Sequence, residues 1–484
     1  ILQMWSTAPR TTSQLARRSC IRAGTTIFSG TADIFPGKAK PSSNAPVLRG
    51  KQAGAPSVLG NQNVCVFSVE NNSANKGLLQ VKKVCGLRNS RNMCSDSGEE
   101  LRPAVTMFSE SEEALRESVE TFAREIVAPK VAEMDREGVM DKDVIDACFA
   151  QGVMGIEAPE EYGGVGMGFT AACLAVEELA KVDPAVAVMV DIHNTLLITA
   201  FMRYGTPAQK TQYLTRLCTD TVSSFCLSEP GSGSDAFALK TKAELDEAKG
   251  EWVLNGGKCW ISNAMEAGLF LVFANADFSK KHRGITAFIV ERDNPGLHIG
   301  KKEDKLGIRA SSTCEISFED LRIPRDAVLG EVGGGYKLAI SLLNEGRIGI
   351  GAQMVGLAQG AFDTTMPYLH QRKQFGTAIA DFQGVQFQYA RARMEIEAAR
   401  VLVYNAARLK ENNQPFLQEA AMAKLYASET AGHVASLCID WLGGVGFTKA
   451  MPAEKFYRDS KIGTIYEGTS NIQLATIAKA LQQH

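Results

Sequence analysis

LSEPGSGSD, residues 227–235, lies where the hydrophobic pattern of the chain changes from a helical to an extended period. Its glycines would let backbone amides approach a phosphate closely, and the hydroxyls of Ser228, Ser232 and Ser234 would add donors. Most Gly/Ser loops are simple turns. The stretch matches neither the G-x-x-x-x-G-K-[ST] loop nor the strand–G-x-G-x-x-G–helix fingerprint, so a nucleotide site here would have to be of another kind.

Downstream of this loop, to about residue 330, apolar residues alternate with polar ones. Short runs rich in β-branched and aromatic residues are separated by Gly, Asn, Pro or charge: WVLNGGKCWIS, LFLVFANAD, ITAFIVERD, LHIGKK and CEISFEDLRIP. We expect an antiparallel β-barrel or sandwich, with Asn255-Gly256-Gly257 as a hairpin turn. No helical segment separates the runs, which excludes a doubly wound parallel sheet.

Helical periodicity flanks this region on both sides. Apolar residues recur every three or four positions in ESEEALRESVETFAREIVAPKVAEMD and FTAACLAVEELAKVD, and again in three or four long segments from Tyr336 onward. We therefore predict an α+β fold of three domains. An N-terminal α-helical domain would span residues 103–221, a middle β domain 222–330, and a C-terminal helical bundle 331–484.

Charge is distributed unevenly along the 484 residues. Residues 1–95 hold 13 Lys/Arg and only two acids, Asp33 and Glu70, which leaves 39 basic and 52 acidic residues in the remainder. An Arg/Ser/Thr-rich, acid-poor leader is typical of a mitochondrial transit peptide, so we expect residues 1–102 to be a mitochondrial leader or disordered. The alternative is a translated non-coding stretch. The acidic remainder argues against a nucleic-acid surface.

Two further classes of protein are disfavoured by composition. The eleven cysteines are scattered without a C-x-x-C or Cys/His cluster, so they read as reduced thiols and we expect no metal site. No stretch approaches 18 consecutive apolar residues, so we expect no membrane span.

Four later motifs follow LSEPGSGSD in a fixed order. They are Trp260-Ile261-Ser262, Arg372-Lys373-Gln374-Phe375-Gly376 with Gln383, Gly443-Gly444-Val445-Gly446, and Ile465-Tyr466-Glu467-Gly468-Thr469-Ser470-Asn471. Each is modest alone. Together they resemble the acyl-CoA dehydrogenase family over residues from about 109 to the C-terminus.

This resemblance implies noncovalently bound FAD and a set of residues around it. Trp260 would pack against the isoalloxazine, Ser262 would hydrogen-bond near N5, and Ser228 would serve the pyrimidine end. Arg372 and Gln383 would reach the FAD of a neighbouring subunit, which implies a homotetramer. The full cofactor set is Leu227, Ser228, Glu229, Gly231, Gly233, Ser234, Trp260, Ile261, Ser262, Arg372, Phe375, Gln383, Gly443, Gly444, Thr469, Ser470 and Asn471.

The resemblance also identifies the catalytic base as Glu467. Removing a proton from the carbon next to a thioester needs a base and a group that stabilises the oxyanion. The family uses the backbone N–H of the base residue, with a flavin hydroxyl, for the second task. Outside this motif, Glu467 would more readily be an exposed loop acid.

Substrate contacts are implied mainly on the segment from Tyr336. Some family members carry the base immediately before Arg347, but here that position is Gly346, which would leave room for a branched acyl group. Glu345 would point about 100° away around the helix. Ala236 stands where branched-chain relatives often have Ser. The implied substrate residues are Ser234, Ala236, Tyr336, Asn344, Glu345, Gly346, Arg347 and Gly468.

We therefore expect a mitochondrial matrix enzyme that desaturates a short or 2-methyl-branched acyl-CoA and passes electrons to an electron-transfer flavoprotein. Three alternatives use the same fold. One is an isobutyryl- or butyryl-CoA dehydrogenase, and another is the same site working in reverse as a 2-methyl-enoyl-CoA reductase. The third, a DNA-binding flavoprotein, would need a basic face, which the acidic body does not favour.

Overall fold

The computed structural model describes residues 104–482, so the predicted leader lies outside the described part of the chain. Helices fill the sequence up to residue 219, and caps fix where several of them begin. Ser109 and Glu112 form a capping box at the first helix, and Asp183 caps a helix with Pro184 at its first turn. These helices are α1 Glu110–Phe122, α2 Val131–Glu137, α3 Lys142–Gln151, α4 Phe169–Ala180, α5 Pro184–Asp191, α6 Thr199–Tyr204, α7 Pro207–Gln209 and α8 Thr215–Thr219.

α5 continues through a π-helical segment, η5 Ile192–Ile198, into α6. The whole stretch Pro184–Tyr204 is long and apolar enough to cross a membrane by length and composition, but 94% of its most apolar window is buried within the fold. Here it serves as a core helix.

An eight-stranded sheet follows, and all five predicted strand segments are part of it. The strands are β1 Ser223–Cys226, β2 Lys242–Asp246, β3 Glu251–Ser262, β4 Leu269–Asn275, β5 Ile285–Glu291, β6 Leu297–Lys302, β7 Thr313–Pro324 and β8 Val328–Leu329. Their order is β6-β7-β3-β2-β4-β5-β8, with β1 beside β4. Most neighbours are antiparallel, but β1 and β2 each pair with β4 in parallel.

The predicted hairpin turn at Asn255-Gly256-Gly257 is wrong. These residues lie inside β3, which pairs with both β2 and β7. Gly256 has φ +142°, and the register against β7 shifts between Leu254 and Gly256. A Cβ at Gly256 would lie only 2.8 Å from Thr241 on the adjacent chain segment. The glycines therefore form a β-bulge under close backbone packing, a use of Gly that alternation alone does not separate from a turn.

Both faces of the sheet's centre are buried. Along β4, Phe270 and Val272 pack into a core enclosed by the strands, while Leu271 and Phe273 join the larger core shared with the helices.

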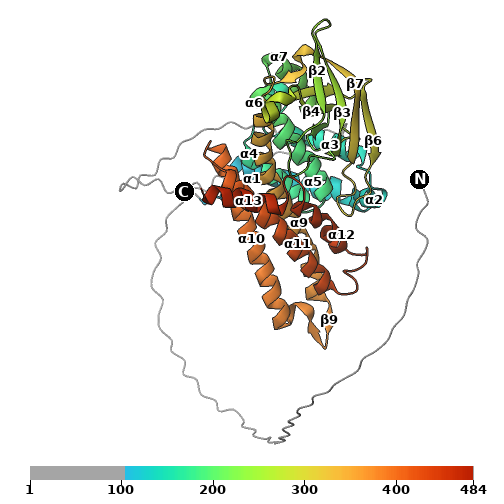
Figure 1. Ribbon diagram of the computed structural model, residues 1–484. Helices are drawn as coiled ribbons and strands as arrows, with labels where there is room; N and C mark the ends of the chain where they lie inside the picture. The colour runs from blue at the N-terminus through green and yellow to red at the C-terminus, as the bar shows by residue number, and fades with distance from the viewer. Residues whose placement is uncertain (1–103, 483–484) are drawn as a thin grey trace, which may run out of the picture. The chain divides into compact units, whose positions relative to one another are not determined.

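The C-terminal part is again helical, as predicted. It consists of α9 Gly335–Gln371, the hairpin strands β9 Lys373–Gln374 and β10 Thr377–Ala378, then α10 Gln383–Glu411, α11 Leu417–Leu442, α12 Ala453–Ser460 and α13 Ser470–Leu481. In Figure 1 the sheet lies at one end of this unit, and α10 and α11 extend away from it toward the β9 hairpin. α9 packs on α4 through Gly356 and Gly360. An added Cβ at Gly356 would collide with the carbonyl of Glu177 in α4, and one at Gly360 with the carbonyl of Lys181, the residue after α4.

Candidate active site

The turn that precedes α13, residues 466–469, is strained and firmly held; we call it the catalytic turn. Glu467 has φ +50°, which is unfavourable for a residue with a side chain, and Gly468 follows with φ +87°. Gln473 Nε2 donates to the carbonyls of Glu467 and Gly468, at 2.9 Å each. Thr469 caps α13 by accepting from the N–H of Ile472, as its residue type predicts. Strain that is held this tightly is typical of functional sites.

The Glu467 carboxyl is buried in an uncommon way. Its Oε2 atom has no hydrogen-bond partner among the described residues. Burial raises the pKa of Glu467 to about 7, although the positive charges of Arg347 and Lys424 oppose the shift. A carboxyl with a pKa near neutrality is suited to accept a proton at physiological pH.

Gly346 makes room for this carboxyl. A Cβ added at Gly346 would lie 3.0 Å from Glu467 Oε2 and 3.2 Å from Leu196 Cδ2. α9 therefore presents bare backbone to the Glu467 carboxyl, and a larger residue at position 346 would displace this carboxyl. The structure thus brings together Gly346, Arg347, Glu467 and Gly468, four residues that the resemblance assigns to one site.

Unsatisfied polar atoms gather at the same place. Seven buried side-chain atoms of the described chain have no hydrogen-bond partner, and four of them belong to Asp191, Arg347, Glu467 and Gln473. Glu467 interacts electrostatically with both Asp191 and Arg347, and Gln473 holds the catalytic turn. Buried orphans are rare in folded proteins, so such a cluster indicates a site whose partners arrive with a ligand.

Glu345 has different partners from those expected of a substrate contact. Both of its carboxylate oxygens are bonded to the guanidinium of Arg203, and Lys410 Nζ lies 3.5 Å away. Its side chain is only 1% exposed. Because these cations occupy both carboxylate oxygens, the contacts favour a structural role for Glu345. Its side chain points away from Glu467, as its position on the helix predicts.

Two other predicted substrate residues, Tyr336 and Asn344, lie in the N-terminal part of α9. The Tyr336 ring packs against Phe237 at 4.3 Å and His282 at 4.7 Å, measured between ring centroids. Ala236, next to Phe237 in the sequence, is half-buried. Asn344 Oδ1 accepts from Arg347 Nη1 at 3.1 Å, which orients that guanidinium.

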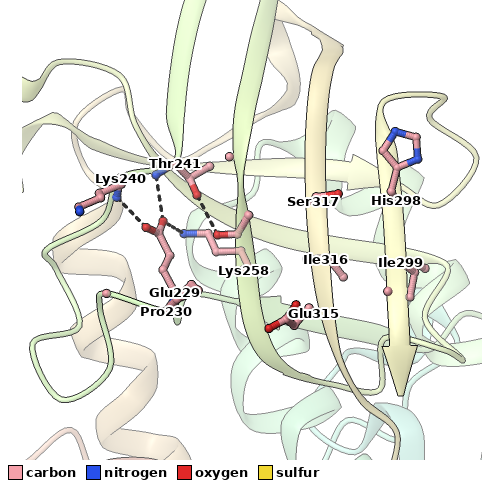
Figure 2. A pocket seen from close by; sticks show the side chains of 14 residues that line it. Glu229, Pro230, Lys240, Thr241, Lys258, His298, Ile299, Glu315, Ile316 and Ser317 are labelled. Carbon is pink, nitrogen blue, oxygen red and sulfur yellow. Dashed lines mark hydrogen bonds and ion pairs between the residues drawn. The ribbon is translucent and has the colours of Figure 1, made fainter. Parts of the chain in front are cut away.

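Glu229, predicted to bind the cofactor, holds the LSEPGSGSD loop in place. Figure 2 shows its carboxylate accepting from the backbone N–H groups of Lys240 and Thr241, at 2.7 and 3.1 Å, and pairing with buried Lys258 Nζ at 2.7 Å. Lys258 also donates to the Leu227 carbonyl. These groups line a cavity of about 530 Å³ between the loop and strands β3, β6 and β7. The Glu229–Lys258 ion pair therefore fixes the loop to β3, a role that the residue types alone do not reveal.

The front of the loop is open. A Cβ added to Gly231 or Gly233 would meet no atom within 4 Å, and Ser234 is exposed. Ser232 differs from expectation, because its hydroxyl is buried and donates to the Asp235 carbonyl. The Ser228 carbonyl accepts from Cys259 N–H, so the loop is joined to β3 just before Trp260.

Trp260 is exposed rather than part of the core. It has φ +60° within a register shift of β3, and 65% of its surface is accessible. The Ser262 carbonyl accepts from Ser224 Oγ, which fixes the end of β3 behind it. An open Gly loop beside a protruding indole fits a cofactor in which a flat ring system is joined to phosphates, as in FAD.

Of the remaining residues predicted to bind the cofactor, those outside residues 469–471 lie elsewhere. Phe375 is 99% exposed with φ +53°, and Gln383 is exposed at the start of α10. Gly443 and Gly444 have open space around them. Figure 1 places the β9 hairpin, which adjoins Arg372 and Phe375, at the far end of the bundle from the sheet. Within one chain, these residues are therefore not brought to the LSEPGSGSD loop.

Four residues at the site were not predicted from the sequence: Asp191, Lys258, Lys424 and Gln473. Lys424 and Lys258 are buried lysines in unremarkable helix and strand patterns, and only the fold reveals that their charges face Glu467 and Glu229. Gln473 lies two residues beyond the recognised motif, inside α13, and nothing in the sequence indicates that its side chain turns back to bond Glu467.

Comparison with known proteins agrees with this arrangement. Family models for the acyl-CoA dehydrogenase N-terminal, middle and C-terminal domains match residues 109–221, 224–321 and 333–482. The chain belongs to the acyl-CoA dehydrogenase family and is an FAD-dependent oxidoreductase.

Individual relatives are named for particular classes of acyl-CoA. A probable short/branched chain specific acyl-CoA dehydrogenase of Dictyostelium discoideum is 56% identical over 84% of this chain and 98% of its own length. The human mitochondrial short-chain specific enzyme is 44% identical over 74% of this chain and 86% of its own.

Solved structures also match most of the chain. Butyryl-CoA dehydrogenase from Megasphaera elsdenii has a TM-score of 0.76 and 39% identity, covering 78% of this chain and 99% of that one. A chain from the structure of the electron-transferring flavoprotein of Acidaminococcus fermentans has a TM-score of 0.77 and 40% identity, covering 78% and 100%.

Proposed function

We propose that this protein desaturates the Cα–Cβ bond of short, 2-methyl-branched acyl-CoA thioesters, with Glu467 as the base. The observation that supports this most is the Glu467 carboxyl itself. It is buried and unpartnered, has a pKa raised to about 7, and lies against the bare backbone of Gly346. These features match the demands of abstracting a weakly acidic α-proton.

In this proposal the chain's own groups perform the proton chemistry. The Glu467 carboxylate takes the α-proton, and its backbone N–H holds the thioester oxygen on which negative charge develops. Arg347 and Lys424 keep enough positive charge nearby for the carboxylate to form in a buried site. FAD, when bound, supplies the acceptor for the hydride that leaves Cβ.

The LSEPGSGSD loop and the end of β3 would hold that cofactor. Leu227, Ser228 and the open glycines Gly231 and Gly233 would face its polar edge and phosphates, and the Trp260 ring would cover its flat face. The accessible ring of Trp260 and the empty space at both glycines support this assignment.

Preference for a branched short acyl group rests on two observations. Identity is higher to the short/branched-chain relative, 56%, than to the short-chain relative, 44%. Gly346 also leaves space next to the base. Butyryl-CoA is the second candidate substrate class, favoured by the structural match to a butyryl-CoA dehydrogenase. The reverse reaction would use the same residues.

We further propose a homotetramer in the mitochondrial matrix that passes its electrons to an electron-transfer flavoprotein. The exposed Phe375 and the distance of the β9 hairpin from the sheet support a site completed between subunits. The basic, acid-poor residues 1–95 and the mitochondrial relative support import.

Anaerobic titration tests the proposal. The purified yellow protein is mixed with 2-methylbutyryl-, isobutyryl-, butyryl- and octanoyl-CoA, and bleaching of the bound FAD is followed. We expect the fastest bleaching with 2-methylbutyryl-CoA and little with octanoyl-CoA. Faster bleaching by butyryl-CoA would shift the assignment to a straight-chain enzyme. No bleaching by any of the four would overturn it.

A further inference from the structure

Lys424 lies in the N-terminal part of α11 with its side chain fully buried beneath the catalytic turn. Its Nζ donates to the Gly468 carbonyl at 2.8 Å. Across residues 104–482, no acid approaches this ammonium closely enough to form an ion pair. A buried cation held by one carbonyl needs a compensating charge nearby, because burial penalises the ionised form.

The opposite charge that acts on Lys424 is that of Glu467. Burial lowers the pKa of Lys424 to about 8, while the negative charge of Glu467 acts in the opposite direction. Lys424 in turn favours ionisation of Glu467. Each group therefore supports the charged form of the other within a narrow pH range around neutrality.

Other ionisable groups face Glu467 from the elements packed around it. Arg347 on α9 is the second cation, and its guanidinium is also bonded to Asn344. Asp191 at the end of α5 is fully buried, and both this burial and Glu467 raise its pKa well above the ordinary value, which disfavours its charged form. Tyr466, whose hydroxyl donates to Gln353, stays neutral because burial raises its pKa. Two cations thus face one carboxylate.

We propose that Lys424 is a positioning residue for the base: its ammonium anchors the catalytic turn at the Gly468 carbonyl and supplies positive charge beside which Glu467 ionises. This inference rests on the proposed function of Glu467. The anchoring part follows from geometry: Glu467 and Gly468 both have positive φ, and Lys424 is the second donor, with Gln473, at the Gly468 carbonyl.

The charge part gives the test. Lys424→Gln keeps a polar hydrogen-bond donor but removes the charge, so Glu467 should ionise at higher pH. We expect the acid limb of the rate of FAD reduction, measured from pH 5.5 to 9 with 2-methylbutyryl-CoA, to move up by about one pH unit. The rate at pH 6 should then fall about tenfold, and the rate at pH 9 should approach that of the wild type.

A matched control separates this effect from loss of any buried lysine. Lys410 is only 9% exposed and pairs with Glu157 and Glu345 rather than with Glu467. Lys410→Gln should leave the acid limb in place, whatever it does to stability.

The outcomes are distinct. A rate that falls by one factor at all pH values, with the limb unmoved, would overturn the inference and leave Lys424 a structural residue. If Lys424→Gln loses its FAD, Lys424→Met, which keeps most of the side-chain volume, decides the matter by the same shift. A wild type that no acyl-CoA bleaches would instead overturn the proposed function.

Discussion

At the residue scale, Glu467 combines two features that destabilise a fold. Its backbone lies in the left-handed region, and its carboxyl is buried without a hydrogen-bond partner on Oε2. Neither feature helps the chain to fold, so both point to chemistry. Each gives a measurable consequence.

Glu467→Gln should abolish most flavin reduction without loss of FAD. The amide keeps the shape and the backbone N–H but cannot accept the proton, so the rate should fall by about 10²–10⁴-fold. Stopped-flow absorbance with 2-methylbutyryl-CoA measures this. Glu345→Gln is the matched control: it should change the rate per folded enzyme less than about tenfold, although freeing Arg203 and Lys410 should lower stability. The reverse pattern would refute the assignment of the base.

Stability should respond to pH at the same residue. Glu467 has a pKa of about 7 in the fold against 4.5 ordinarily, so the folded protein retains a proton that the unfolded chain releases between these values. Ionising Glu467 in the folded protein therefore costs free energy, and the folded state loses stability as the pH rises from about 4.5 to about 7. Glu467→Gln removes this cost. The unfolding free energy of the variant should therefore exceed that of the wild type by a margin that grows with pH, to at most about 3 kcal/mol above pH 7. Thermal midpoints of both proteins at pH 5 and pH 8 check this; an advantage that shrinks with pH contradicts it.

At the element scale, the α4–α9 contact depends on glycine. A Cβ at Gly356 would collide with the Glu177 carbonyl and approach Ala180 Cβ to 2.8 Å. Gly356→Ala should therefore destabilise the fold by about 1–3 kcal/mol, the usual effect of overpacking. In contrast, Gly432 in α11 has only Ser460 Oγ nearby, at 4.0 Å, so Gly432→Ala should be neutral or stabilise by up to about 1 kcal/mol. Denaturant unfolding of the pair measures both, and equal effects would contradict the packing argument.

The elements themselves were largely predictable, for identifiable reasons. β4 and β5 are continuous apolar runs bounded by turn residues, and the long C-terminal helices keep a helical period. β1 and β2 were missed because they are four and five residues long, and β2 is half polar. The glycines of β3 were misread, because a bulge that avoids Thr241 has the same local sequence as a turn.

The site was predictable only where motifs record it. Glu467, Trp260 and Thr469 lie in recognisable strings, and the structure gives each an environment that suits its proposed role. Lys424 and Asp191 reach the base from helices far away in the sequence. Nothing in a single sequence specifies which buried charges meet across such distances.

At the scale of the whole molecule, the hairpin of β9 and β10 should complete the FAD site of another subunit. Arg372→Ala should weaken FAD retention and the oligomer together, because the exposed hairpin would serve both. Gel filtration with light scattering and the flavin content after dialysis measure the two effects. Arg325→Ala, a surface arginine paired with Glu247, should change neither. Unchanged FAD affinity in an intact oligomer would show that the hairpin does not reach the cofactor.

The separation of the β9 hairpin from the base has a genetic consequence. A subunit carrying Glu467→Gln lacks the base of its own site. A subunit carrying Arg372→Ala lacks a contact with the FAD of its neighbour. In a mixed assembly, an Arg372→Ala subunit keeps its own base and receives an intact hairpin from its Glu467→Gln neighbour. Two loss-of-function alleles of these types should therefore complement each other when co-expressed, whereas two alleles that alter the same element should not.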